Sequence, residues 1–185
     1  MRRLRLVGWL TFLVLGYVQT GQAQDYLYRV LPGDVLSISV WREPELQGLV
    51  IIRPDGGFSF PLVGEVDARG KTLVDLQKIV RERISKLIPD AVVTVSVQEI
   101  KGNKVYVIGQ VNKPGEFPVS RRIDVMQALS MAGGATAFAA LSDITIIRRT
   151  ESNQTVMPFR YPEVIRGKNV QQNILLEPGD IVVVP

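Results

Sequence analysis

The chain has 185 residues with no cysteine and no histidine, and its 22 Lys and Arg residues against 18 Asp and Glu residues give a formal net charge of +4. These counts exclude zinc fingers, thiolate or imidazole metal sites, disulfides, and nucleophiles of the Cys or Ser–His type. With 46% apolar and 22% charged residues, the composition is typical of a folded protein, and the length fits one domain or two small ones.

The N-terminal segment has the pattern of a secretory signal peptide. Arg2, Arg3 and Arg5 form a positive region, Leu6–Val18 carries no charge over 13 residues, and Ala23 closes a small-residue cleavage site. A helix of that length rises about 20 Å, short of the roughly 30 Å hydrocarbon core, so a membrane anchor is disfavoured. Cleavage would remove all three of these cations and leave a net charge near +1. The mature chain would then lack the strong positive charge that is typical of nucleic-acid binding.

Short strand patterns separated by turns follow. Val35–Val40 alternates apolar and polar residues, which predicts a strand with one buried face. Val50–Ile52 and Phe58–Phe60 flank Arg53–Gly57, whose Pro-Asp-Gly-Gly stretch predicts a hairpin turn between them. Ala91–Gln98 alternates again and predicts a further strand.

One long helix is expected between these strands. Thr72 is a suitable N-cap, and Asp75 three residues on predicts a capping-box arrangement. Apolar residues then recur at helical spacing as far as Ile88, and Pro89 is expected to end the helix.

The pattern restarts near Lys101-Gly102-Asn103, where we place a domain boundary. Asp124 caps a short expected helix that ends at Ala132 before paired glycines, and Tyr161–Gly167 is expected to form a helical turn. The uncharged stretch Val125–Ser142 is too polar and too rich in glycine for a membrane span. The strands expected in this half are Val105–Ile108, Phe117–Val119, Ile144–Arg148, Thr155–Phe159 and Ile181–Val184.

A short motif occurs twice. Leu31–Val35 and Glu177–Ile181 both place Pro-Gly-Asp directly before a strand. Pro-Gly is a type II turn pair and Asp bonds nearby backbone N–H groups, so both copies predict a tight turn that leads into a strand.

Catalytic interpretations find little support. Gly70-Lys71-Thr72 opens a helix as a P-loop does, but the spacing from Gly64 is one residue too long and an exported protein has no routine access to ATP. Ser85 and Lys86 are adjacent, so they do not face each other on a helix. A glycosidase needs two carboxylates at a defined separation, and the candidates are Glu43, Glu45, Asp55 and Glu65.

Aromatic residues offer one further possibility. Trp41, Tyr26, Tyr28 and Phe58 would suit a surface that stacks on sugar rings, but core packing is the favoured interpretation. Asn153-Gln154-Thr155 matches a glycosylation sequon, which is frequent by chance.

Taken in order, these motifs resemble the Wza-like outer-membrane polysaccharide export family of polysaccharide biosynthesis/export proteins. Tyr28–Leu36, Phe60–Val66 and the helix entry after Gly70 are similar to its export domain, and Val105–Val111 with the closing Pro-Gly-Asp is similar to an SLBB domain. The positions that carry the resemblance, whose expected role is turn geometry, are Pro32, Gly33, Asp34, Pro54, Asp55, Gly56, Pro61, Gly64, Gly70, Gly109, Pro114, Gly115, Gly133, Gly134, Pro178, Gly179 and Asp180.

The resemblance implies an α+β fold, with a small polysaccharide-export module followed by a β-grasp-like SLBB module. The expected division is a signal peptide at 1–23, the export domain at 24–100 and the SLBB domain at 101–185. The implied function is that of a periplasmic component of a capsular or exopolysaccharide export machinery, which forms or caps an oligomeric conduit across the outer membrane.

The implied partners are the polysaccharide, further copies of the chain in a homo-oligomeric ring, an inner-membrane co-polymerase and a separate outer-membrane porin, with no nucleic acid. Larger family members carry a lipid on an N-terminal cysteine, a second SLBB domain and a membrane-crossing C-terminal helix. This sequence shows none of the three, so a non-lipidated periplasmic protein, peripheral to the outer membrane, is expected. No catalytic residue, cofactor or metal is expected.

Two other functions stay open on the sequence alone. One is a stand-alone periplasmic module that binds a glycan or another ligand. The other is an enzyme that acts on polysaccharide, which would use carboxylates such as Glu45 and Asp55.

Overall fold

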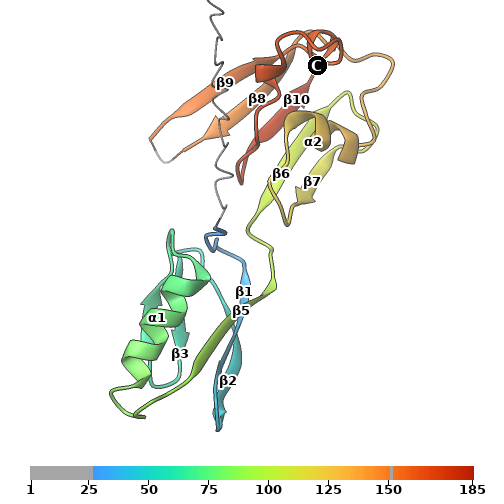
Figure 1. Cartoon of the computed structure of the whole chain (residues 1–185). Coiled ribbons are helices and arrows are strands. Elements are labelled where there is room, and N and C mark those ends of the chain that lie inside the picture. The colour runs from blue at the N-terminus through green and yellow to red at the C-terminus, as the bar shows by residue number, and fades with distance from the viewer. Residues whose placement is uncertain (1–26, 151) are drawn as a thin grey trace, which may run out of the picture.

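The computed structural model describes residues 27–150 and 152–185. The predicted signal peptide and Tyr26 therefore lie outside the described residues. Two clusters of buried apolar side chains are present, one built from Val30 to Val95 and the other from Val105 to Val184. Figure 1 shows the two modules that contain them, joined by the extended segment after β5.

A three-stranded antiparallel sheet forms the first module. Strand β1 (Val35–Val40) lies between β2 (Glu43–Ile51) and β5 (Val93–Glu99). The alternation predicted for β1 is confirmed, because Leu36 and Ile38 are fully buried on one face of the strand. Both outer strands leave an edge without a paired strand within the described residues.

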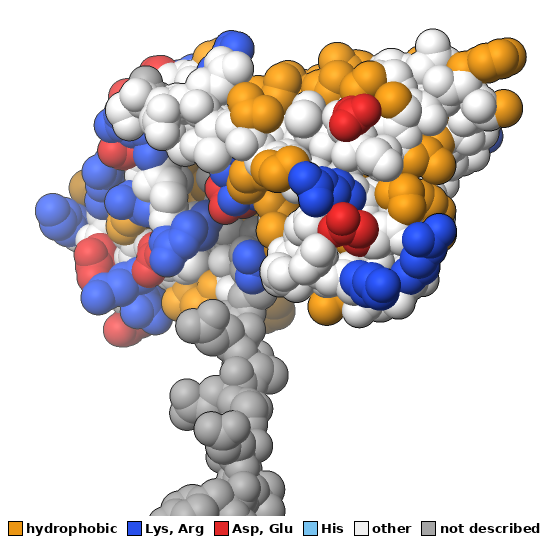
Figure 2. All heavy atoms as spheres, turned by 90° about the horizontal axis from the view of Figure 1, so that it is seen from above, with side chains coloured by type: hydrophobic (Ala, Val, Ile, Leu, Met, Phe, Trp, Pro, Cys, Tyr) orange, Lys and Arg blue, Asp and Glu red, His pale blue; other side chains and the backbone are white. Residues whose placement is uncertain are grey.

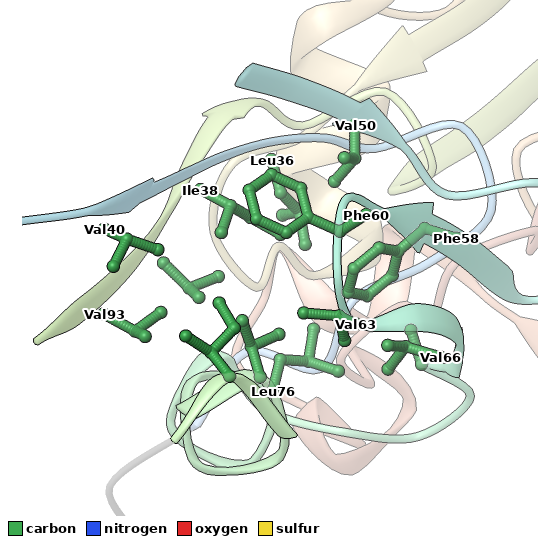
Figure 3. Close-up of a cluster of buried hydrophobic side chains, with 14 of the residues drawn as sticks. Leu36, Ile38, Val40, Val50, Phe58, Phe60, Val63, Val66, Leu76 and Val93 are labelled. Atoms are coloured by element: carbon green, nitrogen blue, oxygen red, sulfur yellow. The ribbon is translucent and has the colours of Figure 1, made fainter. Parts of the chain in front are cut away.

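One face of this sheet is covered by a hairpin and a helix. The hairpin consists of β3 (Gly57–Phe60) and β4 (Gly64–Asp67), and the helix is α1 (Leu73–Ile84). Side chains from all three elements point toward one another in Figure 3, where Phe58 and Leu76 meet the side chains of the sheet. The cluster is fully apolar at its centre, and burying such side chains contributes about 1.5–3 kcal/mol each.

The capping box predicted for the long helix is confirmed. The Thr72 hydroxyl accepts a hydrogen bond from the Asp75 N–H at 3.2 Å, and the Asp75 carboxylate accepts one from the Thr72 N–H at 2.9 Å. The predicted C-terminal end is wrong, because α1 stops at Ile84 with Ser85 as its C-cap. Residues 86–88 form turns instead, because Pro89 disfavours helical geometry at the residue that precedes it.

The hairpin predicted from Val50–Ile52 and Phe58–Phe60 is wrong. The turn itself is present, because the Arg53 carbonyl accepts a hydrogen bond from the Gly56 N–H at 2.8 Å. The strands on either side pair elsewhere, β2 with β1 and β3 with β4. The reason is that β2 pairs with β1 over a longer stretch than β3 could provide, and β1 carries apolar side chains on its packed face. The turn therefore connects two sheets instead of two strands of one sheet.

The second module is built on a five-stranded sheet with the order β7-β6-β10-β8-β9. The last strand of the chain lies at its centre, parallel to β6 and antiparallel to β8. Helices α2 (Val125–Met131) and α3 (Tyr161–Val164) and the 3-10 turn η1 (Val170–Gln172) lie in the connections. The strands are β6 (Lys104–Gly109), β7 (Gly115–Pro118), β8 (Ile144–Arg149), β9 (Gln154–Phe159) and β10 (Ile181–Val184).

The predicted elements of this half are present, although β7 begins two residues earlier than the pattern indicated. Asp124 caps α2 in a full capping box with Gln127. The α+β class is confirmed, because helices cover sheets in both modules. None of the helices in the described part of the chain is long and apolar enough to cross a membrane.

Candidate functional site

The first Pro-Gly-Asp turn is closed by a buried carboxylate. Asp34 has no solvent exposure, and its Oδ2 atom accepts hydrogen bonds from the Leu31 N–H at 2.9 Å and from the Tyr28 hydroxyl at 2.5 Å. Gly33 stands at φ +95°, a backbone conformation that favours glycine. The predicted turn before a strand is therefore present, with the acid as its internal acceptor.

The other oxygen of Asp34 binds the connection between the modules. Its Oδ1 atom accepts hydrogen bonds from the Lys101 N–H at 3.0 Å and the Gly102 N–H at 2.8 Å. Gly102 also packs closely on the turn, because a Cβ there would lie 2.5 Å from the Leu31 Cβ. A side chain at that position would push the connection away from the first module.

The second Pro-Gly-Asp turn has the same internal geometry. The buried Asp180 accepts a hydrogen bond from the Glu177 N–H at 2.8 Å, and Gly179 stands at φ +90°. Arg148 forms a two-point pair with the carboxylate, with Nε–Oδ1 at 3.0 Å and Nη2–Oδ2 at 2.6 Å. The hydrogen bond to Asp180 raises the pKa of Arg148 above its usual value.

The two turns lie at the two ends of the same connection. The first binds the N–H groups of Lys101 and Gly102, and the second donates the Gly179 N–H to the Lys104 carbonyl at 2.8 Å. Each buried carboxylate is surrounded by hydrogen-bond donors. That arrangement holds the segment between the modules in place, which is a structural role and not a catalytic one.

The other motif positions of the first module also lie in turns. Asp55 accepts a hydrogen bond from the Gly57 N–H at 3.0 Å, directly after Pro54 and before Gly56 at φ +80°. Pro61 lies in the β3–β4 turn, Gly64 is the first residue of β4 at φ +70°, and Gly70 precedes the cap of α1.

In the second module the glycines bring segments close together. A Cβ on Gly109, at φ +93°, would lie 2.0 Å from the Val184 carbonyl oxygen of the neighbouring strand. Gly133 and Gly134 end α2, and the Asn112 side-chain amide donates to the Gly133 carbonyl at 2.8 Å. Pro114 and Gly115 lead into β7, and Pro178 opens the last turn.

Two of the four carboxylates considered for glycoside cleavage meet at one arginine. Arg53 donates a hydrogen bond from Nε to the Asp55 carboxylate at 3.2 Å and one from Nη2 to the Glu65 carboxylate at 2.7 Å. The three residues line a hollow on the first module. The hydrogen bond from Arg53 lowers the pKa of both acids, and Ser59 adds to the effect on Glu65. A general acid for glycoside cleavage needs a raised pKa, so this pair has the wrong electrostatics.

The remaining candidates are not brought to this hollow. Glu43 and Glu45 lie at the start of β2, whereas Asp55 follows the end of that strand. The N-terminus of α1 is occupied by its own cap, which accounts for Gly70-Lys71-Thr72 without a phosphate. Within the described residues, no group of three or more acidic side chains is placed to hold a metal ion.

The aromatic residues do not form one surface. Phe58 is in the core and the Tyr28 hydroxyl is bonded to Asp34. Core packing, the favoured interpretation for Trp41, is wrong, because the residue is 72% exposed. Its backbone N–H donates to the carbonyl of Val92, which is also exposed, at 2.9 Å. The reason is that Trp41 lies in the two-residue turn between β1 and β2, beyond the covered part of the sheet.

The side of the first sheet that no described element covers is a candidate site that the sequence pattern alone did not predict. We call this surface the open sheet face. The alternation in β1 and β5 was the signal that could have found it, but the pairing of the strands was needed to place the residues together. Its six central positions are Ser37, Ser39, Gln47, Leu49, Thr94 and Ser96.

Comparison with known protein families matches both modules. The family model for polysaccharide biosynthesis/export proteins matches residues 22–98, and the model for the SLBB domain matches residues 103–184. Residues 22–98 therefore form a polysaccharide biosynthesis/export domain and residues 103–184 an SLBB domain, as the motifs predicted.

Individual relatives are similar over most of this chain. It is 29% identical to the EPS I polysaccharide export outer membrane protein EpsA of Ralstonia nicotianae, over 84% of this chain and 46% of the relative. It is 26% identical to the capsule polysaccharide export outer membrane protein CtrA of Neisseria meningitidis serogroup A, over 90% of this chain and 45% of the relative. The chain spans about half the length of these relatives.

Proposed function

We propose that this chain is a periplasmic component of a machinery that exports capsular polysaccharide or exopolysaccharide, in which it forms or caps an oligomeric conduit for the polymer. The observation that carries the proposal is the succession of an export domain and an SLBB domain, which together account for residues 22–98 and 103–184. The names of the relatives, EpsA and CtrA among them, describe polysaccharide export at the outer membrane.

A transport role without catalysis fits the chemistry of the described residues. The two acids that come closest to a catalytic pair, Asp55 and Glu65, are both bound to Arg53 and both have lowered pKa values. A conduit needs many weak contacts along its wall, and it needs no group with a raised pKa.

The surface supports an assembly of several copies. Each sheet ends in strands with an unpaired edge within the described part of the chain, β2 and β5 in the first and β7 and β9 in the second. Such edges favour pairing with another chain, and a head-to-tail interface that closes produces a ring. Figure 2 shows Lys and Arg side chains interspersed with Asp and Glu, so no broad single-sign field on that face opposes contact between copies.

The partners proposed for this assembly are an inner-membrane co-polymerase and a separate outer-membrane porin. They can be identified by introducing photo-crosslinking residues at exposed positions of the edge strands, such as Val156 of β9 and Glu116 of β7. A crosslinked inner-membrane protein and a crosslinked outer-membrane protein are the expected products.

The export role is tested by deleting the gene and measuring polysaccharide in the medium and on the cell surface. We expect secreted polymer to be lost and to return when the gene is supplied on a plasmid. The native mass of the processed chain, measured at increasing concentration with and without the envelope partners, tests the ring. Unchanged polymer secretion in a strain without a second gene of this family would refute the export role.

A further inference from the structure

The first sheet has one packed face and one face that no described part of the chain covers. On the packed face Leu36, Ile38 and Val93 contact the helix and hairpin that cover them, and Figure 3 shows these side chains converging. On the other face, two rows of side chains cross all three strands. The rows are Gln47–Ser39–Thr94 and Leu49–Ser37–Ser96.

These rows form a lattice of small hydroxyl groups. Ser37, Ser39, Thr94 and Ser96 lie at least partly exposed, about 4.8 Å apart across neighbouring strands. None of the four hydroxyls makes a hydrogen bond with any other part of the chain that the structure describes. They therefore present donors and acceptors to whatever lies above the sheet.

Charge is absent from this lattice. The chain as a whole has 22% charged residues, yet neither row contains one. Exposed sheet edges are commonly protected by charged side chains, especially Lys. A face built from hydroxyls suits a ligand that is itself covered with hydroxyl groups.

An aromatic side chain closes the lattice at one end. The hydrogen bond from the Trp41 N–H to the Val92 carbonyl continues the pairing of β1 with β5 by one step, which places Trp41 two positions beyond Ser39. Arg42 beside it stands at φ +67°, a backbone conformation that favours glycine or asparagine at the second central position of a turn. The exposed indole thus lies beside a backbone conformation that another residue than Arg42 would adopt at lower cost, and such local conflicts are typical of functional positions.

We propose that the open sheet face, with Trp41 at its end, is the surface of this chain that contacts the polysaccharide. The hydroxyls exchange hydrogen bonds with sugar hydroxyls, and the indole and Leu49 pack on the apolar C–H faces of sugar rings. This inference rests on the proposed export function and adds where, and by which chemistry, the polymer is contacted. Because the lattice is uncharged, the contact recognises sugar hydroxyls instead of acidic groups and is independent of salt.

A second copy of the chain is the competing occupant. Stable interfaces between copies are apolar at their centre. Here the exposed apolar side chains lie at the margins, Leu49 and Ile51 on the edge strand β2 and Trp41 and Val92 at one end, while the central strand carries serines. The open sheet face is therefore better matched to a sugar polymer than to a protein.

The test uses the processed chain from Gln24 onward, whose single tryptophan is Trp41. Its fluorescence is followed while soluble fragments of the producing strain's own purified polysaccharide are added, at low and at high NaCl. We expect a saturable change of emission with equal affinity at both salt concentrations. The triple variant Ser37→Ala, Ser39→Ala, Thr94→Val should bind about tenfold more weakly, because each lost hydrogen bond is worth a modest factor.

Thr155→Val is the matched control, since Thr155 is an exposed strand threonine of the second module whose hydroxyl is also unbonded within the described residues. It should bind like the unsubstituted chain. Trp41→Ala, which removes the reporter, is tested by retardation in gels that contain the polymer. Circular dichroism verifies that every variant is folded. An absent emission change, or a triple variant that binds as tightly as the control, would overturn the inference.

Complementation separates this inference from the proposed function. If the unsubstituted gene restores export to the deletion strain and the triple variant restores it equally with unchanged polymer binding, the open sheet face is not the contact surface, although the export role stands. If the unsubstituted gene has no effect on export, the export role itself fails. If the triple variant loses self-association in sedimentation but keeps polymer binding, the face is an interface between copies and the inference is wrong.

Discussion

Asp34 holds Gly102, 68 positions later in the chain, through a hydrogen bond of 2.8 Å from the Gly102 N–H to the Asp34 Oδ1 atom. The carboxylate belongs to the first turn of the first module, and the amide belongs to the segment that leads into the second module. A single buried acid thus joins turn formation to the placement of the connection. In an assembly of several copies, a fixed connection would give every copy the same shape.

Replacing Asp34 by alanine should destabilise the first module by about 2–4 kcal/mol, because the N–H groups of Leu31, Lys101 and Gly102 lose their acceptor in a buried site. Urea unfolding followed by circular dichroism measures the loss. Amide hydrogen exchange should also become faster at Lys101 and Gly102.

Asp143→Ala is the control for that change. Asp143 is exposed, and its side chain makes no hydrogen bond within the described residues. Its removal should alter the free energy of unfolding by less than about 0.5 kcal/mol. Equal losses for the two variants would show that the buried bonds of Asp34 contribute little.

Gly109 is expected to tolerate no side chain. In Gly109→Ala the new Cβ would meet the Val184 carbonyl oxygen at 2.0 Å, and the residue would have to keep φ +93°. The pairing of β6 with β10 would have to open, so we expect a loss of about 3 kcal/mol or more in urea unfolding.

Gly134→Ala separates the clash from the backbone cost. Gly134 has a similar φ of +78°, but a Cβ there meets no atom within 4 Å. Only the left-handed conformation is then unfavourable, which costs about 1 kcal/mol. If both alanine variants lose the same free energy of unfolding, the close approach of Gly109 to Val184 does not contribute to the cost of the substitution.

Features encoded locally were predictable from the sequence. The capping boxes of Thr72 and Asp124 depend on residues three positions apart, and the Pro-Gly-Asp turns depend on four consecutive residues, so both are visible in a linear pattern. The buried face of β1 follows from alternation alone. For these elements local preference and tertiary packing agree.

Features that depend on pairing were not predictable. The turn at Arg53–Gly57 suggested that its flanking strands pair, but which strands join is decided by the apolar face of β1 far from the turn. The central position of β10 beside β6 is likewise set by packing and not by sequence distance. The open sheet face exists only once β2 and β5 lie on both sides of Ser37 and Ser39.

Arg148 should contribute strongly to the stability of the second module, because it forms an ion pair with the buried Asp180. Arg148→Met removes the cation and leaves the carboxylate with fewer donors in a buried site, which should cost about 2–4 kcal/mol. The measurement is the urea midpoint of the module, followed through near-ultraviolet circular dichroism of its tyrosines.

Arg149→Met is the matched control, because Arg149 is the exposed neighbour whose side-chain contact is to Gln154 at 3.4 Å. It should shift the midpoint little. Combining Arg148→Met with Asp180→Asn should recover part of the loss, since the uncompensated buried charge is then gone. A double variant with the summed losses of the two single variants would argue against coupling of the pair.

The ion pairs of Arg53 should set how the first module responds to acid. Arg53→Met removes the hydrogen bonds that lower the pKa values of Glu65 and Asp55, so both values should rise toward the ordinary range in carbon-13 NMR titrations. Arg69→Met is the control, because Arg69 lowers the pKa of Asp67 to about 2 and should affect that acid while Glu65 keeps its low value.

The sign of the effect on stability follows from the direction of these shifts. A carboxyl group with a lowered pKa in the folded state stabilises the fold above its unfolded pKa, and it loses that contribution as the pH falls through the folded pKa. The unsubstituted chain should therefore lose stability as the pH falls below about 4, where unfolded Asp and Glu take up protons first. Arg53→Met should be less stable at neutral pH and should show a smaller loss in that acid window. An equally steep loss in the variant would mean that Glu65 and Asp55 owe their low pKa values to something other than Arg53.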